Sequence, residues 1–195
     1  AGFDGVDIHG AFGYLLDQFL ESGWNHRTDA YGGSVENRAR FTIEVVEEVL
    51  KVWNSNRVGI KLSPSNMFNS MFDNNPKETF SYIIEKLNDY KLGYLHLMQP
   101  QLPFDKLPEN YIHDVISYFR PMYKGNLIAN AGYTRDKAIE TVETGLAEMV
   151  SFGSLFISNP DLPKRLELNL NLTAPDRRTF YGGGENGYID YPFAD

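Results

Sequence analysis

Two side chains that can exchange protons, His9 and Tyr14, follow a short β-type run near the start of the chain. We predict that residues 3–9 form a buried parallel strand, which delivers both side chains to its carboxyl end. In α/β proteins ligands bind at that end, because the loops vary while the strands hold their first residues rigidly. A histidine there can donate a hydrogen bond to a carbonyl or phenolate oxygen, and a tyrosine holds a transferable proton. The alternatives are a core histidine with satisfied hydrogen bonds and a tyrosine that only packs.

A second set of residues could hold an anion. Lys61 lies inside an apolar strand, where its charge is costly unless it meets an anion or hydrogen-bond acceptors. An electron-poor ring or its negative oxygen is a candidate partner, and a lysine that reaches solvent at the strand end is the alternative. Two turns, Ala131-Gly132 and Gly153-Ser154, each lead from a strand into a helix. Exposed amides at helix starts attract phosphate, so these turns are predicted phosphate-binding elements.

Other reactive side chains fit the patterns of catalytic sites less well. His96 alternates with apolar neighbours, which predicts a core position. Ser151 and Ser154 lack the nucleophile-elbow pattern, which argues against a hydrolase. No group of His, Asp and Glu has metal-ligand spacing, and we predict no catalytic metal.

The elements that position these residues alternate between short apolar runs and longer segments of helical period. Such alternation indicates βα units around a parallel sheet. The predicted strands cover residues 3–9, 57–62, 94–98, 126–130 and 148–152. The predicted helices are one capped by Ser34, one capped by Asn75, one over residues 111–119, and one from Thr134 to near Gly145 with Ala138, Ile139 and Val142 facing inward. We expect a single domain over residues 1–195, with βα units to residue 159 and a tail over 160–195.

The composition narrows the class of protein. The chain has 195 residues with 18 basic and 26 acidic side chains, so its net charge is −8 and it offers no basic footprint for nucleic acid. The absence of cysteine excludes disulfides, thiolate metal sites and cysteine nucleophiles. No apolar run approaches the roughly 20 residues that span a bilayer, and no signal segment opens the chain. A cytoplasmic protein that uses small molecules rather than nucleic acid or membrane is therefore expected.

A long ordered series of motifs resembles the old yellow enzyme family of FMN-dependent ene-reductases, closest to its N-ethylmaleimide and 12-oxophytodienoate reductase branch. The similarity extends over essentially the whole chain. The motifs are Phe3-Asp4-Gly5-Val6-Asp7-Ile8-His9-Gly10-Ala11, Gly13-Tyr14-Leu15-Leu16-Asp17-Gln18-Phe19-Leu20, Arg27-Thr28-Asp29, Tyr31-Gly32-Gly33-Ser34, Glu36-Asn37-Arg38, Leu62-Ser63-Pro64, Tyr94-Leu95-His96-Leu97, Phe156-Ile157-Ser158-Asn159-Pro160 and Phe180-Tyr181-Gly182-Gly183-Gly184.

The resemblance implies an α/β fold of the (β/α)8 TIM-barrel type, here a partial barrel with strands 4–8 and the C-terminal tail. It also implies FMN as cofactor, NAD(P)H as reductant and reduction of the C=C bond of an α,β-unsaturated carbonyl compound. By the resemblance, His9 holds the substrate oxygen and Tyr14 donates a proton to the α-carbon. Tyr181 lines the substrate pocket, Lys61 faces the flavin, and the turns Ala131-Gly132 and Gly153-Ser154 cradle its phosphate.

The sequence departs from the family pattern at three of these positions. Phe12 stands where the family usually has Asn or His as the second group on the substrate oxygen. Lys61 replaces a usual Arg, which keeps the charge but loses the planar two-pronged donor. Ser154 replaces an Arg on the phosphate and can offer one hydroxyl bond without a charge.

Two further interpretations stay open at this point. The first three strands of the family barrel have no counterpart in these residues. A non-catalytic remnant with weak or no flavin binding is therefore one alternative, and its exposed strand edges would favour self-association or pairing with a missing N-terminal segment. A flavin-free aldolase with Lys61 as Schiff base is the other.

Overall fold

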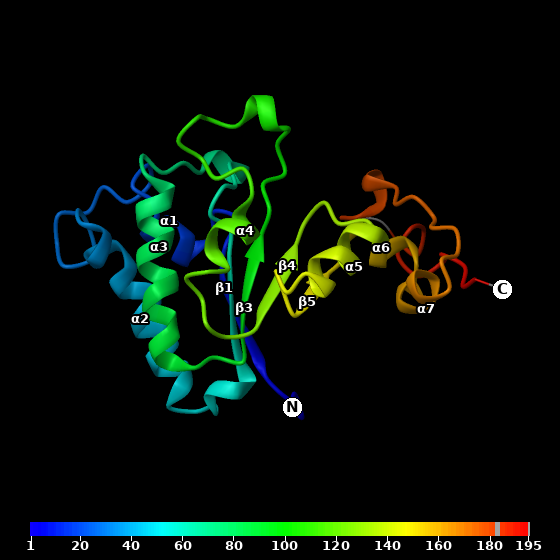
Figure 1. Cartoon of the computed structure of the whole chain (residues 1–195), viewed down its shortest axis with the longest axis horizontal. Coiled ribbons are helices and arrows are strands. Elements are labelled where there is room, and N and C mark those ends of the chain that lie inside the picture. Colours follow the sequence, from blue (N-terminus) through cyan, green and yellow to red (C-terminus); the bar gives the residue numbers. More distant parts are fainter. Residues whose placement is uncertain (182–183, 195) are drawn as a thin grey trace.

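The computed structural model describes residues 1–181 and 184–194, so Gly182 and Gly183 of the tail motif lie outside the described residues. Strands and helices alternate along most of the chain (Figure 1). The strands are β1 Val6–Gly10, β2 Val58–Leu62, β3 Tyr94–Met98, β4 Leu127–Asn130 and β5 Met149–Ser151. The helices are α1 Leu15–Leu20, α2 Val35–Leu50, α3 Pro76–Leu87, α4 Val115–Phe119, α5 Arg135–Glu143, α6 Ser154–Ser158 and α7 Leu162–Glu167.

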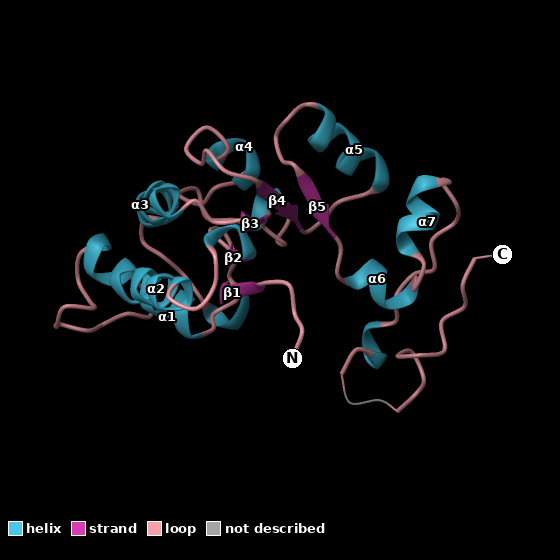
Figure 2. Cartoon of the chain, turned by 90° about the horizontal axis from the view of Figure 1, so that it is seen from below, coloured by secondary structure: helices cyan, strands magenta, loops and turns pink. Residues whose placement is uncertain are grey.

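The five strands form one parallel sheet in the order β1-β2-β3-β4-β5, which confirms the predicted βα units. Figure 2 shows the strands following one another along an arc, with α2, α3, α4 and α5 on its outer side. Sequential parallel order along a curved sheet is the arrangement of a barrel wall. Among the described residues, β1 and β5 each pair with a single neighbour.

The two faces of this sheet differ in chemistry. On the outer face, Ile8, Ile60, Leu95 and Ala129 are buried in one apolar core with side chains of α2, α3 and α4. Successive residues of a strand point to opposite faces, so the intervening residues share the inner face of the arc. Polar side chains from every strand lie there: Asp7, His9, Lys61, His96, Asn130 and Ser151.

Two predicted helix caps are confirmed. The Ser34 hydroxyl accepts a hydrogen bond from the Asn37 amide at the start of α2. Asn75 accepts from the Glu78 amide, and Pro76 occupies the first turn of α3. Such caps satisfy amides that have no partner inside the helix, and each is worth about 1 kcal/mol. They fix the residues at which α2 and α3 begin.

The predictions for the next two helices were partly wrong. The predicted helix over residues 111–119 begins only at Val115. Asp114 caps it by accepting a hydrogen bond from the Ser117 amide, and the Gln99 side chain accepts one from the Val115 amide. In α5, Ile139 and Val142 are exposed rather than inward, and Thr141 is its buried residue. Helix α5 packs against β5 at the end of the sheet. It therefore has less of its surface covered than a helix that lies between two neighbouring helices.

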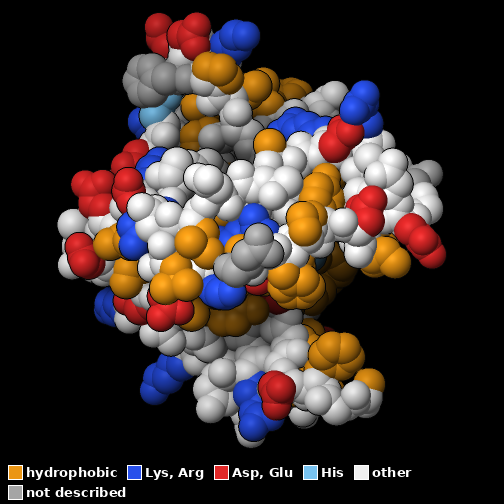
Figure 3. All heavy atoms as spheres, turned by 90° about the vertical axis from the view of Figure 1, so that its right-hand side faces the viewer, with side chains coloured by type: hydrophobic (Ala, Val, Ile, Leu, Met, Phe, Trp, Pro, Cys, Tyr) orange, Lys and Arg blue, Asp and Glu red, His pale blue; other side chains and the backbone are white. Residues whose placement is uncertain are grey.

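The segment after β5 folds back on itself on the side of the molecule away from α2 and α3 (Figure 1). Arg165 of α7 is buried and donates to Asp161 (2.6 Å), to the Asn171 carbonyl (3.1 Å) and to the Pro192 carbonyl (2.7 Å). These bonds tie the last residues to α7. Figure 3 views the molecule from this side, where hydrophobic side chains lie among charged ones at the surface.

Within the described part of the chain, none of the helices has the length and apolar character needed to cross a membrane. The same residues contain no cluster of three or more His, Asp or Glu side chains suited to a metal ion.

Candidate active site

The predicted catalytic side chains meet at the carboxyl ends of β1 and β2. His9 and Lys61 are paired neighbours in the sheet register. The Tyr14 ring lies 5.4 Å from the His9 ring between centroids, and the Phe12 ring is stacked on His9 at 6.2 Å with an interplanar angle of 6°. The Lys61 ammonium lies 5.4 Å from the centre of the Phe12 ring. Four predicted site residues from two segments of the chain therefore form one cluster.

The loop that carries Phe12 has an unusual backbone. Phe12 and Gly13 are both left-handed, with φ of 59° and 74°. A Cβ on Gly13 would lie 2.7 Å from the Met71 side chain, so glycine is required by both conformation and space. A left-handed phenylalanine is strained, and surrounding contacts must hold it. The arrangement of the three rings thus depends on what fixes this loop.

The charges of the cluster influence one another. Burial lowers the pKa of His9, and the positive charge of Lys61 lowers it further, while Asp7 opposes both. Burial also lowers the pKa of the Lys61 ammonium, again opposed by Asp7. At neutral pH His9 is therefore a neutral imidazole, which carries one N–H donor and one acceptor nitrogen. The Ala11 backbone is a hydrogen-bond partner of this ring and raises its pKa slightly, so a ligand carbonyl would compete with Ala11 for the single N–H.

A hydrogen-bonded network on the inner face extends the cluster across the sheet. The Lys61 ammonium donates to Asn130 Oδ1 at 3.2 Å, and the Asn130 amide donates to the Ser151 hydroxyl at 2.8 Å. The same hydroxyl lies 2.8 Å from Nε2 of His96, whose Nδ1 is 3.5 Å from Asp7. The network connects β1 to β5 and places Lys61 in contact with the end of β4.

The sequence predictions missed most of this network. His96 is buried, as expected for a core position, yet it is hydrogen-bonded on the polar face rather than packed in the apolar core. Asp7, Asn130 and Ser151 were not singled out for a role. The sequence signal that could have found them is a polar residue on the same face of several neighbouring apolar strands. This signal is visible only when the strands are compared with one another.

The two predicted phosphate turns lie at adjacent strand ends, because β4 and β5 are paired neighbours. Ala131 and Gly132 are both left-handed, with φ of 74° and 72°. A Cβ built on Gly132 or Gly153 meets no atom within 4 Å, so both turns border open space. An anion can approach backbone amides only where no side chain covers them. Ser154 follows directly as the first residue of α6.

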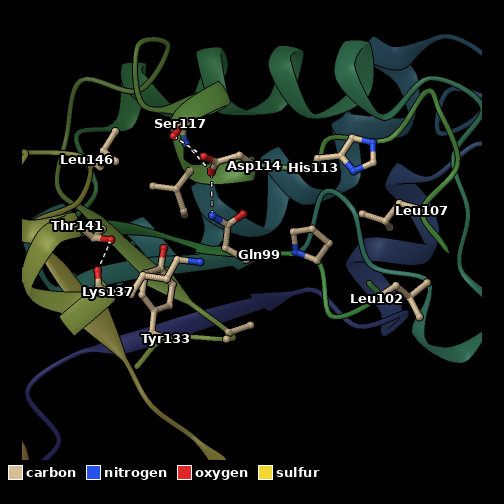
Figure 4. Close-up of a pocket in the computed structure, with 14 residues that line it drawn as sticks. Gln99, Leu102, Leu107, His113, Asp114, Ser117, Tyr133, Lys137, Thr141 and Leu146 are labelled. Carbon is tan, nitrogen blue, oxygen red and sulfur yellow. Dashed lines mark hydrogen bonds between the residues drawn. The ribbon is translucent and has the colours of Figure 1, made fainter. Parts of the chain in front are cut away.

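A pocket of about 320 Å³ lies beside the first of these turns, between α4 and α5 (Figure 4). Both residues of that turn line it, and Gln99 donates to Asp114 at 2.8 Å along its wall. Neither His9 nor Lys61 lines this pocket. It is therefore a neighbour of the predicted site and not its centre.

Tyr181 lies in the C-terminal segment and is 91% exposed. Its ring contacts that of Phe180 at 6.3 Å between centroids. The structure thus leaves Tyr181 free to reach a ligand without placing it beside His9.

A buried acidic cluster lies behind the Phe12 loop. Asp17, Glu21 and Asp73 are almost completely buried, and Arg38 is 3.9 Å from Asp73. Burial, with the charges of Asp17 and Asp73 added, raises the pKa of Glu21 to about 10. Burial also raises the pKa of Asp17 to about 7, against hydrogen bonds from Gly13 and Ser63. Glu21 is consequently protonated at neutral pH.

We expect the Glu21→Gln variant to be more stable than the wild type at pH 9. In the unfolded chain Glu21 ionises near its ordinary pKa, whereas in the folded chain its pKa is about 10. At any pH between these two pKa values, unfolding releases a proton. Stability is then lost as pH rises, by up to about 1.4 kcal/mol per pH unit for this group. Urea unfolding at pH 7, 8 and 9 should give a shallower decline for Glu21→Gln. The exposed Glu36→Gln serves as control, and equal slopes in all three proteins would contradict the assignment.

The family model described as NADH:flavin oxidoreductase / NADH oxidase matches residues 1–173. The chain belongs to this flavin oxidoreductase family. The predicted membership in the old yellow enzyme family is confirmed, because plant 12-oxophytodienoate reductases and a solved old yellow enzyme structure match the whole chain.

Two plant reductases are among the curated proteins that are similar to this chain. 12-Oxophytodienoate reductase 1 of Oryza sativa subsp. japonica is 44% identical over 197 residues, which cover all of this chain and 52% of the relative. 12-Oxophytodienoate reductase 2 of Arabidopsis thaliana is 42% identical over 98% of this chain and 51% of its own. The chain spans about half the length of these relatives.

Solved structures of the family have the same fold. Morphinone reductase superposes with a TM-score of 0.90 at 42% identity, and the old yellow enzyme from Trypanosoma cruzi with 0.92 at 34% identity. Each match covers 100% of this chain and 51% of the other. These structures are TIM barrels, so the predicted fold class, a partial (β/α)8 barrel of this flavin oxidoreductase family, is confirmed.

Proposed function

We propose that the chain is an FMN-dependent oxidoreductase that uses NAD(P)H to reduce the C=C bond of α,β-unsaturated carbonyl compounds. The observation that carries the proposal is the convergence of His9, Tyr14 and Lys61 at the carboxyl ends of two neighbouring strands. Membership in the flavin oxidoreductase family supports the cofactor. The names of relatives, 12-oxophytodienoate reductase and morphinone reductase, support a small-molecule substrate.

The residues present fit FMN. The turns at Ala131-Gly132 and Gly153-Ser154 border open space and would hold the phosphate through backbone amides, with Ser154 adding a hydroxyl. Lys61 would face the electron-poor flavin ring with its positive charge. When bound, FMN supplies the hydride, which it receives from NAD(P)H and which goes to the β-carbon of the enone.

The remaining chemistry belongs to this chain's own side chains. His9 gives its single N–H to the substrate carbonyl in exchange for its Ala11 backbone partner, and so stabilises the negative charge that builds on the oxygen. Tyr14 gives its phenolic proton to the α-carbon and recovers a proton from water, since it is 57% exposed. Phe12 stacks beside His9 and offers the oxygen no second donor. Tyr181 of the C-terminal segment lines the substrate pocket in this proposal.

The proposal is tested by mixing the purified protein with FMN. Flavin fluorescence should be quenched as FMN binds, and NADPH oxidation should then become dependent on cyclohexenone. A protein that binds no FMN would overturn the proposal and favour a non-catalytic partial barrel. Its mass in solution would then show whether copies associate through the edges of β1 and β5.

Tyr14→Phe gives the matched control for the chemistry. The variant keeps the ring beside His9 and loses only the transferable proton, so FMN binding should be unchanged. Turnover of cyclohexenone should fall by about 10²- to 10⁴-fold, the usual contribution of a general acid. Steady-state kinetics at saturating NADPH would measure the drop. Unchanged turnover in Tyr14→Phe would assign the proton to another donor.

A further inference from the structure

The strained loop between β1 and α1 is held by side chains on both of its backbone edges. Asn69 donates to the Phe12 carbonyl at 2.9 Å, and Gln18 donates to the Gly13 carbonyl at 2.6 Å. On the opposite edge the Phe12 amide donates to the Ser63 hydroxyl at 3.0 Å. The partners come from α1 and from the segment after β2. The loop therefore takes its shape from elsewhere in the fold.

A single carboxylate lies at the centre of the amide edge. The Gly13 amide donates to Asp17 Oδ2 at 2.8 Å, and the Ser63 hydroxyl lies 3.5 Å from the same oxygen. The two amides of the left-handed residues therefore reach one carboxylate, Gly13 directly and Phe12 through the Ser63 hydroxyl. Neither Asp17 nor Ser63 is exposed to solvent.

We propose that Asp17 is a positioning residue for the predicted catalytic loop. Its carboxylate fixes Gly13 directly and Phe12 through Ser63, and thereby sets the Tyr14 and Phe12 rings against His9. The role deepens the proposed function and rests on it for any effect on turnover. Asp17 acts through the Gly13 amide and the Ser63 hydroxyl, so it is a positioning residue and not a catalytic one.

The surroundings of Asp17 make this anchor sensitive to pH. Glu21 of α1 and Asp73 of the segment after β2 face it with acidic groups, Arg38 of α2 lies next to Asp73, and the Tyr111 hydroxyl borders the cluster. Burial raises the pKa of Asp17 to about 7. An ionised carboxylate accepts stronger hydrogen bonds than a protonated one. The loop should therefore be held more firmly above pH 7 than below it.

Hydrogen exchange of the Phe12 and Gly13 amides measures the anchor without any flavin. In the wild type we expect their protection factors to fall about threefold or more between pH 8 and pH 6. Asp17→Asn should lower both factors at pH 8 and remove the pH step. Ser63→Ala, which removes one hydroxyl and no charge, should lower the factor of Phe12 more than that of Gly13.

Asp73→Asn is the matched control, because it removes a buried acid of the same cluster that does not touch the loop. It should leave the protection factors at pH 8 unchanged and move the pH step to lower pH, since Asp73 raises the pKa of Asp17. The proposal would be overturned if both variants, Asp17→Asn and Ser63→Ala, kept these two protection factors within twofold of the wild type.

Turnover of cyclohexenone by the FMN-loaded protein adds a second readout. Asp17→Asn should lower kcat at least tenfold with the KM for NADPH unchanged, because the loop affects Tyr14 and not the reductant. If the wild type shows the protection pattern but no turnover, the anchor is supported and the proposed function fails. If the wild type turns over and Asp17→Asn does so at the same rate, the positioning role is overturned.

Discussion

Arg38→Met should destabilise the folded chain by about 3–5 kcal/mol, the usual result of removing one partner from a buried charged network. The Arg38 guanidinium is buried and donates to the Leu20 carbonyl (2.7 Å), the Gly33 carbonyl (2.6 Å) and the Thr79 hydroxyl (2.8 Å). It also lies 3.9 Å from Asp73. Methionine fills much of the volume but leaves these acceptors without a donor. Urea unfolding at pH 7 measures the loss.

Arg40→Met is the control on the same helix. Arg40 is exposed, and its guanidinium donates to the Ala30 carbonyl and the Asn37 side chain at the surface. Its removal should cost under about 1 kcal/mol. Equal losses for the two variants would mean that the buried network contributes nothing specific, and that Arg38 only covers apolar surface.

Phe12→Asn should raise turnover of an enone by about 10²- to 10³-fold in the FMN-loaded protein. A side chain at position 12 projects beside His9, and an asparagine amide there would give the substrate oxygen a second donor. A donor at a developing oxyanion is worth about 2.7–4 kcal/mol in the transition state. Asparagine also tolerates the left-handed φ of 59° better than phenylalanine does. Steady-state kinetics with cyclohexenone at saturating NADPH would show the gain.

Phe12→Leu separates hydrogen bonding from space, because it removes the ring and adds no donor. We expect its turnover to stay within a few-fold of the wild type. If Phe12→Asn were no faster than Phe12→Leu, the substrate oxygen would not be held at this position. A gain in both variants would show that the phenylalanine ring obstructs the substrate.

Local rules account for the elements that the sequence predicted well. β3 covers Tyr94–Met98, as expected, because a short apolar run bounded by turns has few other conformations. Ser34 and Asn75 mark helix starts because their side chains bond amides only three residues away. β1 begins at Val6 and not at residue 3, since strand ends depend on the neighbour and not on the strand itself.

The predictions that missed part of the structure have a common physical cause. The periodic pattern of apolar residues shows which side chains share one face of a strand or helix, but not what covers that face. His96 is buried, as predicted, yet the face on which it lies is the polar inner one. Ile139 and Val142 follow the helical period, yet α5 lies at the end of the sheet and leaves them exposed. Asp17 stands in an apolar helical run, and its burial was not anticipated.

The sequence by itself determined the βα alternation, the caps and the spacing of His9 and Tyr14, because those depend on contacts within a few residues. It also carried the family resemblance. The tertiary structure decided which side chains work together. Phe12 meets Ser63 from 51 residues away, and Lys61 meets Asn130 from 69 residues away. Such partners are set by how strands pair and how distant segments pack, which are interactions between elements and not within one of them.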